Sequence, residues 1–171
     1  RWRSQLILFL LACNTLPEPA IRTPYRSTEG VPVAGMAEGF SDLPIGAPLG
    51  GYTGRCDCFG NDGEVDKRDS QYSLEFNPSA GLHTRPKLQA LWLDNGDQDL
   101  VLLKADAIYS FDDMVEDLEY RLSEATGRDL EGRVVLATNH SHSQPGNYQH
   151  GVTWYLGGDR YNEEIYQRFT A

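Results

Sequence analysis

The 171-residue sequence predicts an α/β fold in which helices flank a mixed β-sheet. The apolar segments 87–93 and 99–106 are expected to form an antiparallel hairpin, because Asn95–Gly96 between them favours the positive φ angles of a type I′ turn. A predicted helix over 110–126 then leads to a third apolar segment, 133–138. Because a helix that joins two strands can make them parallel, we expect both kinds of pairing in one sheet.

Two elements are expected before the hairpin. Val33–Ala37 is short and apolar and is predicted to be the first strand. Residues 42–52 hold two prolines and three glycines, which disfavour a helix and most ladder pairing. We therefore expect an ordered loop whose glycines allow close backbone approach, although their spacing is not that of a nucleotide-binding motif.

The helix over 110–126 has signals at both ends and along one face. Ser110 is the expected N-cap, acidic residues follow in the first turn, and Gly127 is expected to end the helix. Apolar residues at helical spacing predict its buried stripe: Met114, Leu118 and Leu122. After the strand 133–138 we expect a loop, then the apolar segment 152–156, and then a second helix from about Arg160.

Composition excludes several classes of protein. With 25 acidic and 15 basic residues the net charge is −10, which disfavours a nucleic-acid-binding surface. No apolar run reaches the roughly 18 residues that a membrane-spanning helix needs. These observations predict a soluble, acidic, globular domain.

The first thirteen residues have the features of an export signal. Two arginines precede the short apolar stretch Leu6–Ala12, and Leu10–Cys13 resembles a bacterial lipobox, in which the cysteine is lipidated. The alternative is a buried element that ends in an ordinary core cysteine. The export interpretation divides the chain into a signal peptide with a lipobox (1–13), a Pro-rich tether (14–31) and the folded domain (32–171). It implies a lipoprotein of the bacterial cell envelope, held at the membrane surface by its lipid, or a secreted protein.

The polar segment between the predicted loop and hairpin gives weaker signals. Cys56 and Cys58 are too close to pair readily with each other, and no second cysteine cluster completes a zinc knuckle. We expect structural or unpaired thiols there. Asn61–Asp66 faintly resembles a calcium loop, but its spacing is wrong for an EF-hand, and a solvated loop is favoured.

The segment most suggestive of chemistry follows the strand 133–138. His140 and His142 lie just past the carboxyl end of a buried strand, where α/β sheets commonly bind ligands. In an extended stretch, residues two apart point to one side, so the pair suits a metal ligand beside a polarising or acid–base imidazole. His150 is close enough in sequence to support them. The alternative is two surface histidines in a polar loop.

The same segment resembles a family motif. Thr138–Gly146, Thr-Asn-His-Ser-His-Ser-Gln-Pro-Gly, is similar to the Gly-Thr-His-Thr-His-Ser-Gly-Pro-Gly motif of the neutral/alkaline (non-lysosomal) ceramidase family. The resemblance extends over roughly residues 32–170. Weaker matches fall in the same order along the chain as in that family: Val33–Met36, Asp42–Tyr52, Gly81–Arg85 and Val101–Asp106.

The resemblance implies a zinc-dependent amidase that hydrolyses the N-acyl amide of ceramide-like sphingolipids to a sphingoid base and a fatty acid. His140 would be a zinc ligand, and His142 would polarise the amide carbonyl or stabilise the oxyanion. The family's other zinc ligands, a second His, a Glu and a Tyr, come from later in its chain. We therefore expect the truncated N-terminal part of a larger ceramidase-like catalytic domain, inactive as an isolated fragment.

Departures from the family pattern bear on the substrate. Asn139 and Gln144 replace smaller residues on the expected rim of the site and, with Gly146, are candidate substrate-binding residues. His83 and Arg85 are weaker candidates, because a buried His beside a strand is more often structural. The alternative functions are a surface-anchored binding or structural lipoprotein domain without activity, and a metal hydrolase acting on another amide or ester.

Overall fold

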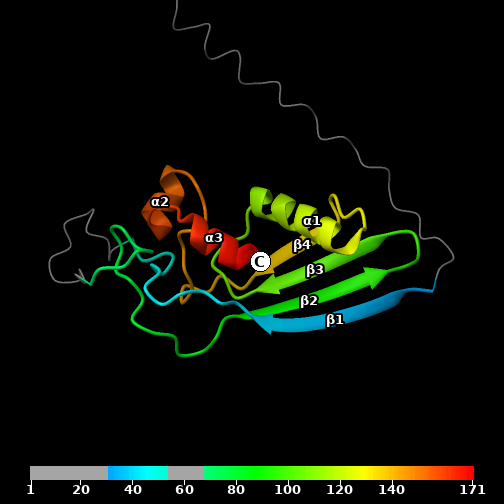
Figure 1. Ribbon diagram of the computed structural model, residues 1–171, viewed down its shortest axis with the longest axis horizontal. Helices are drawn as coiled ribbons and strands as arrows, with labels where there is room; N and C mark the ends of the chain where they lie inside the picture. The colour runs from blue at the N-terminus through cyan, green and yellow to red at the C-terminus, as the bar shows by residue number, and fades with distance from the viewer. Residues whose placement is uncertain (1–30, 54–67) are drawn as a thin grey trace, which may run out of the picture.

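The computed structural model describes residues 31–53 and 68–171. Within these residues the chain forms one four-stranded sheet and three helices (Figure 1). The strands are β1 (Val33–Phe40), β2 (Lys87–Asp94), β3 (Asp99–Ala105) and β4 (Val134–Thr138). The helices are α1 (Asp112–Thr126), α2 (Val152–Gly158) and α3 (Glu163–Thr170). The expected export signal, nearly all of the tether, both Cys56 and Cys58, and the segment 61–66 lie outside the described residues.

The sheet is mixed, as the sequence predicts. Its order is β1-β2-β3-β4, with β1 and β2 antiparallel and β2 and β3 antiparallel. Strands β3 and β4 are parallel, with Val101 opposite Val134, because α1 carries the chain back between them. Each predicted strand is therefore confirmed, and the parallel pair places the ends of β3 and β4 at one edge.

The turn between β2 and β3 differs from the prediction. The strands pair as far as Asp94 and Asp99, which leaves a four-residue loop in which Gly96 has a φ of 96° and Asn95 does not have a positive φ. The Asn95 side chain instead accepts hydrogen bonds from the backbone N–H groups of Asp97 and Gln98. The predicted type I′ turn is wrong, because the side chain of Asn95 organises a longer loop.

Helix α1 has the predicted length and buried stripe but a different cap. Its N-cap is Phe111, which makes no capping hydrogen bond, so the prediction of Ser110 is wrong. Phe111 lies there because its ring packs against Trp154, with centroids 4.7 Å apart. Met114 is fully buried, and Gly127 ends the helix with a φ of 69°, as predicted.

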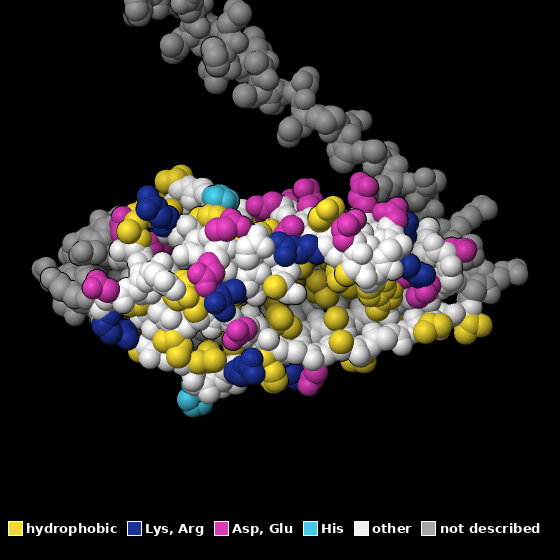
Figure 2. Space-filling view, in the orientation of Figure 1, with side chains coloured by type: hydrophobic (Ala, Val, Ile, Leu, Met, Phe, Trp, Pro, Cys, Tyr) yellow, Lys and Arg dark blue, Asp and Glu magenta, His cyan; other side chains and the backbone are white. Residues whose placement is uncertain are grey.

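The core lies on one face of the sheet, under α1 and α3 (Figure 1). One cluster joins the end of β3 to both helices and contains Ala105, Ile108, Met114, Tyr148, Ile165 and Phe169. A second cluster lies beneath the other half of α1 and contains Val101, Leu130 and Val134. Between α1 and β1 this face is hollowed into an apolar groove of about 600 Å³ (Figure 2).

The C-terminal third holds one helix more than the sequence predicts. The apolar segment 152–156 belongs to α2, and α3 begins at Glu163 rather than near Arg160. The later start has a local cause, because the Asn162 side chain accepts a hydrogen bond from the N–H of Ile165 and caps the helix. No helix in the described part of the chain is long and apolar enough to cross a membrane.

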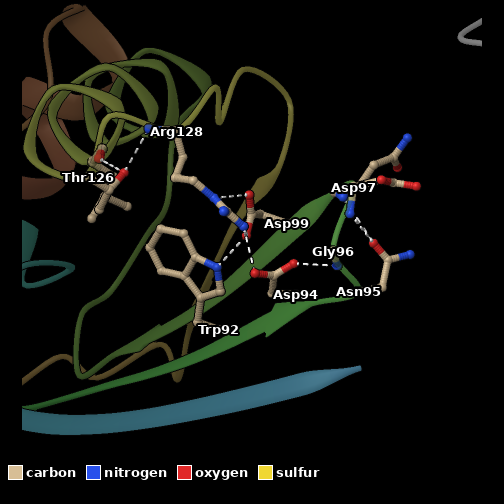
Figure 3. Close-up of polar contacts among 10 residues, drawn as sticks. Trp92, Asp94, Asn95, Gly96, Asp97, Asp99, Thr126 and Arg128 are labelled. Atoms are coloured by element: carbon tan, nitrogen blue, oxygen red, sulfur yellow. Dashed lines mark hydrogen bonds and ion pairs between the residues drawn. The ribbon is translucent and has the colours of Figure 1, made fainter. Parts of the chain in front are cut away.

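The far end of the hairpin is tied to the end of α1 (Figure 3). The Arg128 guanidinium donates to Asp99 Oδ1 at 2.6 Å and to Asp94 Oδ2 at 2.7 Å. Trp92 Nε1 donates to the same Asp99 oxygen at 2.7 Å. Arg128 and Trp92 together hold the pKa of the Asp99 carboxyl below its usual value. This cluster holds β2, β3 and α1 together at the end of the sheet opposite the histidine segment.

Candidate active site

The histidine segment leaves the sheet where β4 ends. Asn139 Nδ2 donates to Asp106 Oδ1 at 2.7 Å, and Asn139 Oδ1 accepts from the Ser141 N–H at 3.2 Å. The Ser141 N–H also donates to the carbonyl of Ala107 at 3.0 Å. The segment is therefore held to the residues that follow β3, and the strand ends fix its position.

The two predicted site histidines come together. Their Nε2 atoms lie 3.2 Å apart, and their ring centroids are 4.7 Å apart at an interplanar angle of 88°. The segment is not the extended stretch that the sequence suggested, because β4 ends at Thr138 and His140 has a φ of 57°. A left-handed residue followed by a turn, rather than strand alternation, makes the rings converge.

The hydrogen bond of His140 decides the state of its ring. His140 Nδ1 lies 2.9 Å from the carbonyl oxygen of Ile108. Because a carbonyl only accepts, Nδ1 carries a proton, and in the tautomer that this bond favours for a neutral ring the lone pair lies at Nε2. That lone pair faces His142. A histidine anchored in this way is oriented like the metal ligands of many proteins, whose second nitrogen donates to a backbone carbonyl or carboxylate.

The ring of His142 is held by the ordered loop before β2. It lies so close to Gly51, whose φ is 80°, that a Cβ atom on Gly51 would overlap the imidazole. The edge of the Tyr52 ring approaches from the same loop, with centroids 5.8 Å apart. Gly51 is therefore required both for its backbone conformation and for the space it leaves to His142.

Three glycines join the loops around the pair. Gly50 N donates to the carbonyl of Gln144 at 3.0 Å, and Gly146 N donates to the carbonyl of Pro48 at 3.1 Å. A Cβ atom on Gly146 would overlap the backbone of both Gly50 and Gly158. The close approach predicted for the glycine loop is confirmed. The structure gives Gly146, a candidate substrate-binding residue, a buried packing position.

An aromatic cluster borders His140. The ring of Tyr109 lies 5.6 Å from that of His140 and 4.8 Å from that of Trp154, which also contacts Phe111. Trp154 belongs to α2, the helix that the sequence did not predict. Its apolar segment after a Gly-rich turn was visible in the sequence, but nothing in the pattern connected it with the histidines.

A buried carboxylate fixes the end of α2. Asp159 is 1% exposed, and its Oδ2 accepts hydrogen bonds from the N–H groups of Leu74 and Phe76 and from the Ser73 hydroxyl. Its Oδ1 accepts from the N–H of Arg160. Sequence reasoning missed this residue. Its partners in residues 73–76 lie more than 80 positions away, so no local pattern connects them with Asp159.

The other sequence candidates lie away from the pair. The ring of His150 stacks on Tyr161 with centroids 3.5 Å apart, so it does not support the histidines. His83 is exposed rather than buried, and its Nδ1 lies 3.1 Å from Thr84 Oγ1. Arg85 places its guanidinium over the Phe40 ring. Asn139 and Gln144 line a polar pocket beside the segment, and neither His140 nor His142 lines it.

His140 offers one nitrogen that could hold a metal ion. The 3.2 Å between the two Nε2 atoms is a hydrogen-bond distance, so the ring of His142 lies directly against that nitrogen. The unprotonated Nε2 of His140 is the nitrogen that a metal requires. In residues 31–53 and 68–171, no group of three or more His, Cys, Asp or Glu side chains converges to hold a metal ion.

Comparisons with known proteins support the fold. The neutral ceramidase of Pseudomonas aeruginosa matches with a TM-score of 0.61 and 20% identity, over 84% of this chain and 20% of that chain. A ceramidase complexed with C2 matches with a TM-score of 0.58 and 17% identity, over 83% of this chain and 20% of that chain. This chain has a ceramidase-like fold.

The ceramidase-like fold is shown by structure alone. No family model matches the sequence, and neither does any curated protein. The chain spans about a fifth of the length of the solved ceramidases that it matches. The expected α/β fold, corresponding to part of a ceramidase domain, is confirmed.

Proposed function

We propose that this chain forms part of the active site of a zinc-dependent amidase that hydrolyses the N-acyl amide of ceramide-like lipids to a sphingoid base and a fatty acid. The observation that carries the proposal is the pair His140 and His142, with Nε2 atoms 3.2 Å apart beyond the end of β4. The ceramidase-like fold supports it, because both solved relatives are ceramidases by name.

His140 is proposed as the zinc ligand. Its Nδ1–H donates to the Ile108 carbonyl, which fixes the ring orientation and increases the basicity of Nε2. Bound zinc would lower the pKa of its water toward neutrality and polarise the amide carbonyl. The protein's contribution is to keep Nε2 of His140 unprotonated and oriented toward the metal position. The hydrogen bond from Nδ1 to the Ile108 carbonyl does this.

His142 is proposed to stabilise the oxyanion. With His140 in that tautomer, the Nε2–H of His142 donates to the Nε2 of His140, 3.2 Å away. When His140 uses its lone pair for a metal, the N–H of His142 becomes free to donate to the amide oxygen as negative charge develops there. Gly51 and Tyr52 keep the ring in place for this task.

The aromatic cluster suits an apolar substrate. Tyr109, Phe111 and Trp154 pack together beside His140, and Tyr52 approaches His142 from the other loop. These rings offer apolar surface to a hydrocarbon chain and restrict water near the amide. We propose that the remaining zinc ligands come from outside the described residues, since a catalytic zinc usually has three protein ligands.

The test is an amidase assay of the natural full-length protein with zinc, using N-acylsphingosine as the substrate. His142→Ala is expected to lower kcat by about 100-fold or more, the usual cost of losing an oxyanion donor. His150→Ala is the matched control, because His150 lies in the same connection but stacks on Tyr161, and it should retain activity within about twofold. Full activity of His142→Ala, or no hydrolysis by the wild type, would contradict the proposal.

A non-catalytic domain with this fold is the second candidate. It is favoured by the fact that the described residues bring together two histidines and no third ligand. A full-length protein that binds no zinc would support it. The protein could bind zinc and cleave another amide or ester but not N-acylsphingosine. That result would support a metal hydrolase and would contradict the ceramide-like substrate.

Export and lipid anchoring at Cys13 complete the proposed function. The basic and apolar residues before Cys13 support this assignment. Metabolic labelling with palmitate should mark the wild type and leave Cys13→Ala unlabelled. A mature protein that begins well downstream of Cys13 would contradict the lipid anchor.

A further inference from the structure

A polar pocket of about 480 Å³ opens beside the histidine segment. Its polar lining comes from the stretch before β2, the end of β3 and the residues after β4, and it includes Arg85, Asp106, Asn139, Ser141, Ser143 and Gln144. Neither site histidine lines it. The pocket is therefore a different place from the proposed metal site, although one segment contributes to both.

Gln144 is the most informative residue of this pocket. It is only 6% exposed, yet its side-chain amide makes no hydrogen bond with any residue in 31–53 or 68–171. Its backbone carbonyl accepts from Gly50, which fixes the residue in place. Among the described residues, the buried side-chain polar atoms without a partner are Ser41 Oγ and Asn147 Oδ1, so the amide of Gln144 reaches the open space of the pocket, where it can donate to and accept from a ligand.

The charges of the pocket nearly cancel. Arg85 lies with its Cζ 5.3 Å from the centre of the Phe40 ring and forms no ion pair with the described carboxylates. Asp106 is the opposing charge, and each of its oxygens already accepts one hydrogen bond, from Lys87 N and from Asn139 Nδ2. Its remaining lone pairs can accept more, while the Arg85 guanidinium can donate.

The remaining groups of the pocket both donate and accept. The hydroxyls of Ser141 and Ser143 and the amide of Gln144 have this double capacity. A hydroxyl-bearing ligand matches such a set, because each of its hydroxyls also donates and accepts. An oxyanion only accepts, so it could use the Arg85 guanidinium but not the lone pairs of Asp106, which would repel it.

We propose that this pocket binds an uncharged polyhydroxylated ring, such as a hexose or an inositol. The guanidinium and the carboxylate would each bridge two neighbouring hydroxyls, and the Gln144 amide would bind a further hydroxyl. The pocket volume falls within the range of small-molecule sites. The proposal does not depend on the amidase assignment, since the two histidines do not line the pocket.

Saturation-transfer NMR on the natural full-length protein tests the proposal, with D-glucose, D-galactose, myo-inositol and inorganic phosphate as separate probes. We expect at least one of the three polyols to bind with a millimolar dissociation constant and phosphate to bind more weakly. Binding of none of the polyols would overturn the proposal. Tighter binding of phosphate would overturn the ligand class and favour an oxyanion site.

Variants locate the binding. Gln144→Leu, which keeps a similar volume and removes the amide, should weaken binding of the polyol at least tenfold. Gln149→Leu makes the same change nearby in a residue that does not line the pocket, and it should bind within twofold of the wild type. If Gln144→Leu does not fold, Arg85→Met at the exposed side of the pocket should weaken binding at least fivefold. Unchanged binding in the folded pocket variant would refute the assignment.

Discussion

The Nδ1 atom of His140 lies 2.9 Å from the carbonyl oxygen of Ile108, and this contact determines which nitrogen of the imidazole faces His142. Ile108 follows β3 and His140 follows β4, so the contact depends on the parallel pairing of these two strands. The state of the candidate metal ligand is therefore set by the sheet itself.

Gly51→Ala should disable the site without unfolding the protein. A Cβ atom there overlaps the His142 ring, and the φ of 80° disfavours any side chain, which together should cost about 1–2 kcal/mol of stability. We expect the rate of amide hydrolysis to fall at least tenfold, because the ring must move. Gly35→Ala is the control, since nothing lies within 4 Å of an added Cβ there. Equal rates for the two variants would show that Gly51 does not position His142.

Two glycines of α2 should respond very differently to alanine. Gly158 packs against the backbone of Gly146 with no room for a Cβ atom, whereas nothing lies within 4 Å of a Cβ at Gly157. Gly158→Ala should lower the free energy of unfolding by about 3 kcal/mol or more, as backbone overlap cannot be relieved by rotating a side chain. Gly157→Ala should be neutral or slightly stabilising. Urea denaturation measures the free energy of unfolding of both variants. Similar losses for the two would contradict the close contact between the backbones of Gly146 and Gly158.

Asp159→Asn tests the buried carboxylate. The backbone N–H groups of Leu74 and Phe76 both donate to the Asp159 carboxylate, and an Asn side chain would place its own N–H₂ group against such donors. We therefore expect a loss of about 3 kcal/mol in the free energy of unfolding. Asp129→Asn, at an exposed position in the turn before β4, should change it by less than about 0.5 kcal/mol. A loss below 1 kcal/mol for Asp159→Asn would show that water replaces these bonds easily.

The Arg128 cluster should make stability depend on acid pH. Hydrogen bonding from Arg128, the largest cause, lowers the pKa of Asp99. The resulting stabilisation is fully present above the unfolded-chain value of about 3.9. It is lost as the pH falls through the lowered pKa of the folded state. Arg128→Gln should therefore be less stable than the wild type at pH 7. The difference in the free energy of unfolding between the two proteins should narrow below pH 3.9. Urea denaturation across this pH range measures the difference. A constant difference would show that the Asp99 carboxylate is not stabilised by Arg128.

Much of the fold was predictable because its signals are local. The apolar runs of β2, β3 and β4 and the stripe of α1 predict the mixed sheet, and the helix between β3 and β4 makes them parallel. Helix α2 gave no such signal. It has seven residues, begins with two β-branched residues and ends with two glycines, all poor helix formers. It forms because Trp154 packs between Tyr109 and Phe111.

The site was predictable in its residues but not in its geometry. The His-x-His pattern identified His140 and His142, yet strand alternation was the wrong reason for their convergence. A positive φ at a non-glycine residue depends on tertiary contacts such as that between His140 and Ile108. The glycine loop predicted close backbone approach, but its partners, Gly146 and Gly157, lie about a hundred residues along the chain and could not be recognised from spacing.

The zinc content of the natural full-length protein and of its His140→Ala variant, measured after dialysis, tests most directly whether His140 is a metal ligand. We expect about one zinc per chain in the wild type, at least a tenfold weaker affinity in His140→Ala, and stoichiometric zinc in the His150→Ala control. Stoichiometric zinc retained by His140→Ala would contradict the assignment of His140 as a metal ligand.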